Sequence, residues 1–371
     1  MHAPAARMGG ARSHLLGLVP ELAAIAPGAR FLLVAHPDLL ASLTPLPANW
    51  EALPKRAEDR SFLWRLAWEQ KTLPSIARGW RADVLLSFGS FVPLRAPCPT
   101  VLEAGNALLF TLAYWRLLAH EPVPVRLEQA ARWFLLKASL RSAARVLAPT
   151  RAMCQDVVAV LPGLAERVDV VYWGVADYFR AAAWCPPSLP KLVGVSKHGV
   201  NKEFDVLVAA LPRLLDGWPD LRLELTGTAD ESRWSRQTWA LAERLGVAGR
   251  VAFVGELPND QVPGLLASGS LLVFPTWCES FGLPLAEALA LGAPAVAGDI
   301  PACREIGSDA AYYYHPGDPA SLADKITALL ADPRSAAALA AKARSRGDLF
   351  RWRKNAEGIW ATLERAVSPG Q

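Results

Sequence analysis

The sequence lacks the usual marks of membrane-spanning, secreted and disulfide-stabilised proteins. It has no stretch of about 18 consecutive apolar residues, since its best run, residues 107–115, contains Thr111 and ends at Arg116. Its first residues lack the apolar segment of a secretion signal, and its five cysteines are scattered and never spaced as Cys-x-x-Cys. We therefore expect a protein of the reducing cytoplasm.

Motifs of metal and nucleotide chemistry are also missing. There is no Asp-x-Asp pair for a divalent ion, and the histidines show no metal-ligand spacing. The absence of Gly-x-x-x-x-Gly-Lys-Ser/Thr and Gly-x-Gly-x-x-Gly disfavours P-loop and simple dinucleotide-binding enzymes. We expect no metal ion, no bound cofactor and no nucleic-acid partner.

Composition points to a globular protein of two domains. The chain has 371 residues, of which 52% are hydrophobic, and its net charge is only +4, which excludes fibrous and disordered classes. Residues 1–175 hold 19 Lys and Arg against 13 Asp and Glu, whereas the remainder holds 20 against 22. A positive first half suits an acidic acceptor or an anionic membrane face, and an arginine-rich solvated surface explains it equally well.

Apolar runs of strand length alternate with segments of helical period, which predicts parallel sheets and an α/β fold. The runs are residues 30–35, 83–88, 145–148 and 168–172 in the first half, and 191–195, 221–226, 251–254, 271–274 and 293–297 in the second. Asp318-Pro319 predicts a helix start, Pro284 and Gly292 predict the two ends of another helix, and residues 350–366 form an amphipathic final helix. The proline-rich segment 176–190 is predicted to link the domains.

The stretch 274–292 contains the most informative pattern. A strand ends at Phe274, a loop contains Glu279, and a helix begins at Pro284, the arrangement in which open α/β sheets bind ligands. Backbone N–H groups at the helix start favour a diphosphate, and Glu287, one turn into the helix, is placed to accept hydrogen bonds from a ribose diol. The N–H groups belong to Phe281, Gly282 and Leu283.

The spacing of the two glutamates means little by itself, because 35 acids in 371 positions give about three such pairs by chance. An exposed loop acid beside a helix acid explains it as well. The surrounding order of strand, acid, Phe-Gly-Leu-Pro and acid favours the functional interpretation.

Residues 274–318 resemble the donor domain of the retaining glycosyltransferases of family four, which have the GT-B fold of two Rossmann-like domains facing across a cleft. The motif corresponds to Glu279, residues 281–284 and Glu287, and the similarity continues through residues 298–307. The resemblance implies that Glu279 contacts hydroxyls of the donor sugar, that Glu287 contacts the nucleotide ribose, and that a C-terminal helix crosses back to the first domain.

A second stretch, residues 192–205, is a strand, a polar loop and a helix start. Ser196 begins the loop, and Lys197 and Lys202, five residues apart, can converge on a diphosphate as two point charges. The family usually has Arg then Lys at this spacing, so Lys197 replaces a forked contact with a weaker one. Solvent-facing loop lysines are the alternative interpretation.

The first half resembles the family more loosely. Gly9 and Gly10 resemble its glycine-rich turn near donor phosphate and acceptor, and residues 143–153 and 170–175 resemble later elements. The residues before Gly9 do not look like a strand, so either the sheet lacks its first strand or the true start lies upstream. At residues 103–106 many members have His-Asp after a strand, and here Asn106 either hydrogen-bonds substrate or forms a turn.

We therefore expect a GT-B protein with an acceptor-side domain at residues 1–178, a nucleotide-sugar domain at 188–348 and a crossover helix at 349–371. The resemblance implies a retaining hexosyltransferase that moves a sugar from a nucleotide diphosphate sugar to a glycan or lipid-linked acceptor. Family frequency favours GDP-mannose and bacterial surface polysaccharide synthesis at the inner face of the cell membrane. Residues 126–141 either form a basic amphipathic helix on that membrane or a half-buried core helix.

Three alternatives remain open at this point. A GT-B epimerase or phosphorylase shares the architecture, and an inactive sugar-nucleotide-binding partner in a glycan-assembly complex would retain the donor motif. A retaining hydrolase needs two carboxylates about 5 Å apart, and it is disfavoured because Glu287 is expected at the ribose.

Overall fold

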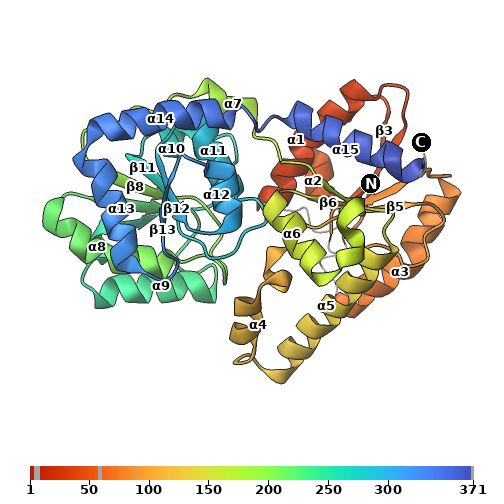
Figure 1. Ribbon diagram of the computed structural model, residues 1–371, viewed down its shortest axis with the longest axis horizontal. Coiled ribbons are helices and arrows are strands. Elements are labelled where there is room, and N and C mark those ends of the chain that lie inside the picture. Colours follow the sequence, from red (N-terminus) through yellow and green to blue (C-terminus); the bar gives the residue numbers. More distant parts are fainter. Residues whose placement is uncertain (4–8, 57–60, 90, 369–371) are drawn as a thin grey trace. The chain divides into compact units, whose positions relative to one another are not determined.

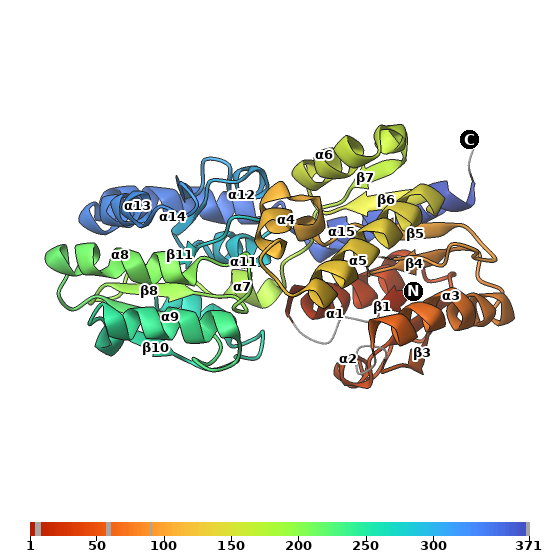
Figure 2. The ribbon, with the colours of Figure 1, turned by 90° about the horizontal axis from the view of Figure 1, so that it is seen from below.

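The computed structural model describes residues 1–3, 9–56, 61–89 and 91–368. The chain divides into unit 1, Met1–Gly174 with Trp352–Gln371, and unit 2, Val175–Arg351. Each unit has one parallel sheet with helices on both faces (Figures 1 and 2), which confirms the α/β class. Among the described residues, no helix combines the length and hydropathy needed to cross a bilayer.

Unit 1 has a seven-stranded sheet in the order β3-β2-β1-β4-β5-β6-β7, and every neighbouring pair is parallel. The strands are β1 (His2–Ala3), β2 (Phe31–Ala35), β3 (Trp50–Pro54), β4 (Leu85–Ser87), β5 (Thr100–Glu103), β6 (Arg145–Ala148) and β7 (Val168–Val170). The helices are α1 (Gly9–Ile25), α2 (Pro37–Ser42), α3 (Phe62–Gly79), α4 (Leu112–Leu118), α5 (Val123–Ser142), α6 (Arg151–Val160) and α15 (Trp352–Val367), with 3-10 turns η1 (Ala107–Phe110) and η2 (Pro162–Arg167).

The first strand is present, contrary to the expectation that the sheet lacks it. His2 and Ala3 are buried and pair in parallel with β2, and His2 also pairs with Ser87 of β4. Two residues are too few to show a strand period, and the two neighbouring strands supply the hydrogen bonds that hold them extended. The strand β1 therefore lies in the middle of the sheet although its sequence is uninformative.

The final helix belongs to unit 1, as expected for a crossover helix. The apolar face of α15, with Ile359 and Leu363, packs with Leu15 and Leu18 of α1 in one buried cluster. The opposite face of the sheet is covered by α3, whose Leu73 packs against β2 and β4.

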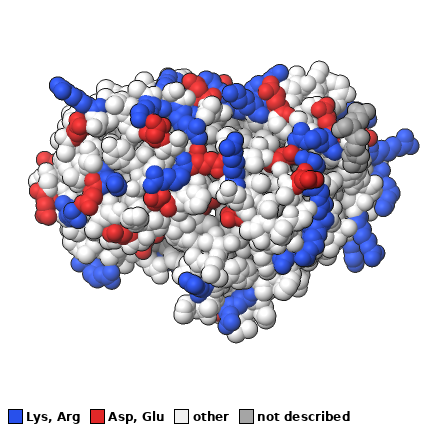
Figure 3. All heavy atoms as spheres, in the orientation of Figure 1, with Lys and Arg blue, Asp and Glu red and all other residues white. Residues whose placement is uncertain are grey.

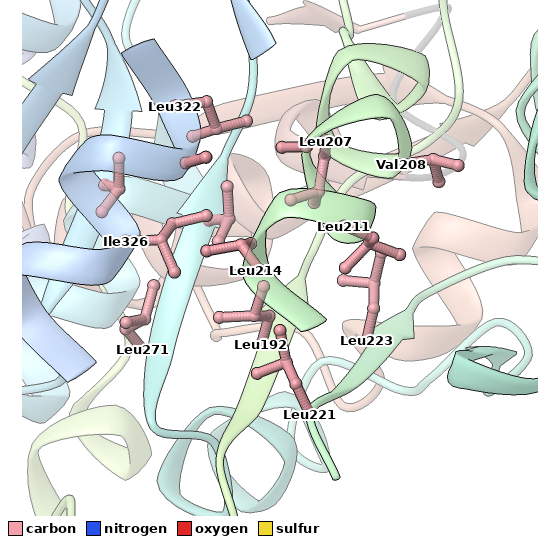
Figure 4. Close-up of a cluster of buried hydrophobic side chains, with 14 of the residues drawn as sticks. Leu192, Leu207, Val208, Leu211, Leu214, Leu221, Leu223, Leu271, Leu322 and Ile326 are labelled. Atoms are coloured by element: carbon pink, nitrogen blue, oxygen red, sulfur yellow. The ribbon is translucent and has the colours of Figure 1, made fainter. Parts of the chain in front are cut away.

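Unit 2 has a six-stranded parallel sheet in the order β10-β9-β8-β11-β12-β13. Its strands are β8 (Lys191–Gly194), β9 (Arg222–Leu225), β10 (Val251–Phe253), β11 (Leu271–Phe274), β12 (Ala295–Gly298) and β13 (Tyr312–Tyr314). Its helices are α7 (Asp177–Ala181), α8 (Phe204–Gly217), α9 (Arg233–Arg244), α10 (Val262–Ala267), α11 (Leu283–Leu291), α12 (Pro301–Gly307), α13 (Pro319–Ala331) and α14 (Pro333–Gly347), with η3 (Ala248–Arg250). Figure 4 shows leucines of α8 interdigitating with Leu322 and Ile326 of α13 over the strands.

The predicted helix ends are confirmed. The Asp318 carboxylate accepts hydrogen bonds from the N–H groups of Ala320 and Ser321 at the start of α13. Gly282 and Gly292 flank α11 with φ angles of 88° and 85°, in the left-handed region that suits glycine.

The segment predicted as a link, residues 176–190, is instead part of unit 2. The guanidinium of Arg180 in α7 donates hydrogen bonds to the carbonyls of Gly347 and Phe350, and the Trp184 indole donates to the carbonyl of Gly269. The chain crosses between units at 174–175 and again at 351–352, rather than at the predicted 178–188 and 348–349. Proline content marks an irregular segment, and these side-chain contacts fix it to one unit.

Candidate active site

The two sequence motifs follow the two strands at which the order of the unit 2 sheet reverses. β8 and β11 are neighbours, but the chain continues from β8 towards β9 and β10 and from β11 towards β12 and β13. Loops that leave such a pair of strands diverge and open a crevice at the carboxyl edge, where ligands of open α/β sheets bind. The sheet topology therefore selects the loops at residues 195–203 and 275–282.

Lys202 and Glu279 meet in this place. The Lys202 ammonium forms an ion pair with Glu279 Oε1, which also accepts hydrogen bonds from Thr276 Oγ1 (3.0 Å) and Asn201 Nδ2 (3.2 Å). The same ammonium lies 4.4 Å from the ring centroid of Phe274. The paired side chains are only 10% and 14% exposed, so their charges attract each other in a partly desolvated environment.

This ion pair leaves polar capacity for a ligand. Among the described residues, Glu279 Oε2 has no hydrogen-bond donor, and the Lys202 ammonium, which has three N–H groups, donates only to Glu279. The carboxylate is also tied to the polar groups of Asn201 and Thr276 through its other oxygen, Oε1. A hydrogen-bond acceptor, Glu279 Oε2, and a cation, the Lys202 ammonium, are thus held together at the edge of the sheet.

Lys197 and Ser196 lie in the same loop and do not join this pair. The ammonium of Lys197 is half exposed and lies 3.7 Å from Glu256 Oε1. Ser196 is tied to Thr226, the residue after β9, since its N–H donates to Thr226 Oγ1 at 3.0 Å and its carbonyl accepts from the same hydroxyl. In this structure the two lysines thus face different carboxylates and do not converge.

The start of α11 provides backbone donors beside the ion pair. Among the described residues, the N–H groups of Gly282 and Leu283 have no backbone acceptor, and a helix N-terminus attracts anions. The side chains of Phe281 and Leu283 are buried and fix this turn in the core. A neighbouring glycine permits the loop to pass, because a Cβ on Gly298 of β12 would lie 1.9 Å from the carbonyl oxygen of Thr276.

Glu287 lies one turn inside α11 and is partly buried. Desolvation raises its pKa to about 8, and among the described residues its carboxyl has no hydrogen-bond or ion-pair partner. Near pH 7 this group is mostly protonated, so it can both donate and accept a hydrogen bond.

Sequence reasoning missed the residues that support the pair. Thr276 and Asn201 hold Glu279, and the Tyr314 hydroxyl donates a 2.5 Å hydrogen bond to Glu203 Oε2. Glu203 is buried, and desolvation raises its pKa. One signal for Glu203 was available in the sequence, namely its position directly after Lys202. Through its hydrogen bond with Tyr314, Glu203 anchors the backbone next to Lys202 to β13.

The predicted residues of unit 1 lie at the starts of that unit's own helical elements. Gly9, with a φ of 62°, and Gly10 are the first residues of α1. The Asn106 side chain caps η1 by accepting a 3.2 Å hydrogen bond from the N–H of Leu108, so the turn-forming alternative is present. In the part of the chain that the structure describes, no group of three or more His, Cys, Asp or Glu is arranged to hold a metal ion.

Comparison with known proteins finds relatives for this part of the chain. Residues 190–332 match the family model of the glycosyl transferases group 1. The chain is 29% identical over 238 residues to a D-inositol 3-phosphate glycosyltransferase of Segniliparus rotundus. This match covers 61% of this chain and 53% of that protein. It is 31% identical over 157 residues to a phosphatidyl-myo-inositol mannosyltransferase of Mycobacterium leprae, covering 38% of this chain and 40% of that one. The chain thus spans about half the length of the curated relatives it matches.

Solved structures resemble the whole chain. Anabaena Alr3699/HepE in complex with UDP-glucose matches with a TM-score of 0.76 and 19% identity over 98% of both chains. WaaG, a glycosyltransferase involved in lipopolysaccharide biosynthesis, matches with a TM-score of 0.73 and 18% identity over 98% of this chain and 97% of that one. Residues 190–332 of this chain are therefore similar to the glycosyl transferases group 1 family, and the fold of the chain is that of the solved GT-B glycosyltransferases.

Proposed function

We propose that the chain is a retaining hexosyltransferase that uses a nucleotide diphosphate sugar and a hydroxyl acceptor. The observation that supports this most is the Lys202–Glu279 pair between the diverging loops of β8 and β11, beside the start of α11. The cation and the helix N–H groups can bind the diphosphate of a nucleotide sugar, and the carboxylate oxygen can accept a hydrogen bond from a hydroxyl of its sugar.

The diphosphate binds at the start of α11. The N–H groups of Gly282 and Leu283 and the ammonium of Lys202 stabilise the negative charge that grows on it as the sugar leaves. Lys202 is oriented by Glu279, so it need not be reorganised when this charge develops. Lys197 turns from Glu256 to the diphosphate only when the donor binds.

The two carboxyl groups hold the sugar and the ribose. Glu279 Oε2 accepts a hydrogen bond from a sugar hydroxyl, while Oε1 stays with Lys202 and Thr276. Glu287, neutral near pH 7, exchanges hydrogen bonds with the ribose diol. Positioning and charge stabilisation are then the main contributions of the protein.

The transfer exchanges one bond at the anomeric carbon for another. The bond to the diphosphate oxygen breaks, the acceptor oxygen bonds to the same face of the sugar, and the acceptor proton moves to the departing diphosphate. The products are a nucleoside diphosphate and a glycoside of unchanged anomeric configuration. The proposed reaction uses no metal ion or cofactor, so we expect a chelator to leave the rate of transfer unchanged.

The substrates are proposed from the relatives. The M. leprae relative is a mannosyltransferase by name, which favours mannose from GDP-mannose, whereas UDP-glucose occupies Anabaena HepE. WaaG acts in lipopolysaccharide biosynthesis, which favours a glycan or lipid-linked acceptor of a bacterial surface polysaccharide.

The experiment compares GDP-mannose and UDP-glucose with the full chain, by thermal shift and by product formation with polyprenyl-linked glycan acceptors. A bound donor raises the unfolding temperature, and Lys202→Ala lowers transfer at least about 100-fold. Lys342→Ala, which removes an exposed lysine paired with Asp309 in the same unit, is the matched control and stays active. Full activity of Lys202→Ala contradicts the proposal, and donor binding without any transfer supports the inactive partner instead.

The acceptor is proposed to reach the enzyme at an anionic cytoplasmic membrane face. Figure 1 shows that α4 and the first turns of α5 extend away from the unit 1 sheet, and on the visible face Figure 3 shows mainly uncharged atoms with basic groups there. Large apolar side chains are exposed beside basic ones, as on helices that lie in a membrane interface. The α4–α5 surface comprises Leu112, Leu117, Val123, Leu127 and Phe134, with Arg116, Arg126, Arg132, Lys137 and Arg141.

Vesicle flotation tests this surface. The chain should float with vesicles that contain phosphatidylglycerol and not with pure phosphatidylcholine, and Leu127→Asp with Phe134→Asp should reduce bound protein about tenfold. Leu189→Asp, at a leucine of unit 2 that is also more than half exposed, is the control. Equal flotation of the double variant and the parent chain contradicts membrane contact through the α4–α5 surface.

A further inference from the structure

Unit 1 contains a buried pair of titratable side chains that the proposed mechanism does not use. His14 of α1 is 1% exposed, and its Nδ1 lies 3.3 Å from Oε1 of Glu103, the last residue of β5. The Trp173 indole Nε1–H donates a 2.8 Å hydrogen bond to the same Oε1 atom. Residues far apart in the sequence thus meet at the carboxyl edge of the sheet.

Asn355 of α15 fixes the tautomer of this histidine. Its Nδ2 donates a 2.8 Å hydrogen bond to the carbonyl of Tyr172, which turns its Oδ1 towards His14 Nε2 at 3.1 Å. An amide oxygen only accepts, so Nε2 must bear the proton. The proton state of the pair is then decided at Nδ1 and Glu103.

One proton between His14 Nδ1 and Glu103 Oε1 gives both of these atoms and the Trp173 indole N–H a hydrogen-bond partner. If it is on Nδ1, Oε1 accepts from both His14 and Trp173; if it is on Oε1, the hydroxyl donates to Nδ1 and still accepts from Trp173. Without it, a nitrogen lone pair faces a carboxylate. Desolvation agrees with a shared proton near neutral pH, because it raises the pKa of Glu103 to about 7 and lowers that of His14 to about 4.

Aromatic rings hold the pair in place. The imidazole stacks on Trp352 with centroids 5.4 Å apart, lies 4.9 Å from the Trp173 ring and meets the edge of Phe88. The Trp352 indole lies against Gly17 and Gly174, where an added Cβ would come within 2.2 Å and 2.4 Å of it. The ring geometry therefore leaves little room for the pair to separate without cost.

No other charge is paired with these two groups among the described residues. The charged side chains on the packed elements have their own partners: Arg12 donates to Ser42, Arg145 pairs with Asp169, and Arg353 of α15 pairs with Glu21 of α1. Lys354 of α15 is exposed. The proton of the pair is thus governed by His14, Glu103, Trp173 and Asn355.

We propose that His14 and Glu103 share one proton and act as a positioning pair for the acceptor side of the proposed transfer. Asn106 follows Glu103 by three residues, and Gly9 and Gly10 begin the helix that bears His14. The shared proton holds β5, α1, α15 and the segment 172–174 in one arrangement. Loss of the proton leaves the lone pair of His14 Nδ1 facing the Glu103 carboxylate, and their repulsion loosens the loops that receive the acceptor.

Glu103→Gln tests the proposal, which rests on the proposed function, in acceptor kinetics. An amide cannot replace the shared group, because its oxygen faces the Nδ1 lone pair and its NH2 faces the Trp173 N–H, unless His14 takes up a proton. We expect the alkaline fall of kcat/KM for the acceptor to move to lower pH, with about a tenfold loss at pH 7.5 and an unchanged KM for the donor.

Adding Trp173→Phe provides the matched rescue. It removes the opposing N–H and keeps an aromatic ring, so the new side-chain amide of the double variant can donate to Nδ1, and activity at pH 7.5 should return to within about threefold of Trp173→Phe alone. A structural role without a proton would lower activity equally at all pH values. A wild-type pH profile in Glu103→Gln, or no rescue in the double variant, overturns the proposal.

A second readout needs no turnover, so it separates this proposal from the proposed function. In ring nitrogen-15 spectra of the full chain, His14 Nε2 should stay protonated across neutral pH while Nδ1 reports the loss of one proton. In the double variant that titration should disappear. A His14 protonated at Nδ1 alone, or an Nδ1 that does not respond to pH in the parent chain, contradicts a shared proton.

Discussion

The two units have the same kind of parallel sheet but build their polar centres differently. In unit 2, Lys202 and Glu279 come from two loops at the strand-order reversal, and the pair keeps free hydrogen-bonding capacity. In unit 1, His14 and Glu103 come from a helix and a strand end, and rings seal them from solvent. A partly exposed pair suits substrate contact, whereas a sealed pair suits the positioning of other elements.

The largest expected effects come from glycines that allow close contacts in each unit. Gly298→Ala would place a Cβ against the Thr276 carbonyl in unit 2, and Gly174→Ala would place one against Trp352 in unit 1. We expect each to lower the free energy of unfolding by about 3 kcal/mol, measured by urea denaturation, because backbone or a packed ring must move. Only Gly298→Ala should also weaken donor binding.

Gly163→Ala is the control for both glycines, since a Cβ there would meet nothing within 4 Å. Equal loss of donor binding in the two variants would remove the difference between the units.

A medium effect is expected from the lone acid of unit 2. The folded pKa of Glu287, about 8, exceeds its ordinary value of 4.5, so the folded state binds more protons between these values and loses stability as pH rises through them. Glu287→Gln removes this loss, and for this partly exposed side chain we expect about 2 kcal/mol of relative stabilisation at pH 8 compared with pH 5. Thermal unfolding at the two pH values measures it, and a parallel pH dependence in variant and parent contradicts the raised pKa.

The smallest effect distinguishes the paired acid of unit 1 from that lone acid. The lowered pKa of His14 makes stability rise with pH between about 4 and 6.5, while the raised pKa of Glu103 makes it fall between 4.5 and about 7. These contributions offset each other in the parent chain. In His14→Phe only the fall caused by Glu103 remains. The free energy of unfolding of this variant should therefore drop about 1 kcal/mol more than that of the parent between pH 5 and pH 7.

Glu103→Gln should show the reverse slope in the same unfolding experiment, because only the His14 contribution remains. Identical slopes in the three proteins would mean that the two groups do not titrate as a pair.

The sequence predicted what depends on local pattern. Strand, loop and helix around Glu279 follow one another within a short stretch, and Gly292 and Asp318 mark helix ends by their own chemistry. Contacts between distant segments gave no such signal. Nothing in the sequence indicates that Asn355 orients His14, that Thr276 holds Glu279, or that Arg180 ties α7 to unit 2.

Short elements were missed for a related physical reason. β1 has two residues, too few to show a period, and it exists because β2 and β4 hydrogen-bond to it from both sides. The lysines show the opposite case, since their spacing suggested convergence while nearby carboxylates draw Lys202 to Glu279 and Lys197 to Glu256.

The most direct test of the proposed donor site is a crystal structure of the full chain with GDP-mannose or UDP-glucose. We predict a diphosphate within hydrogen-bond distance of the Lys202 ammonium and the Gly282 and Leu283 N–H groups, with a sugar hydroxyl on Glu279 Oε2. A nucleotide bound elsewhere, with the Lys202–Glu279 pair untouched, would contradict the assignment of this site.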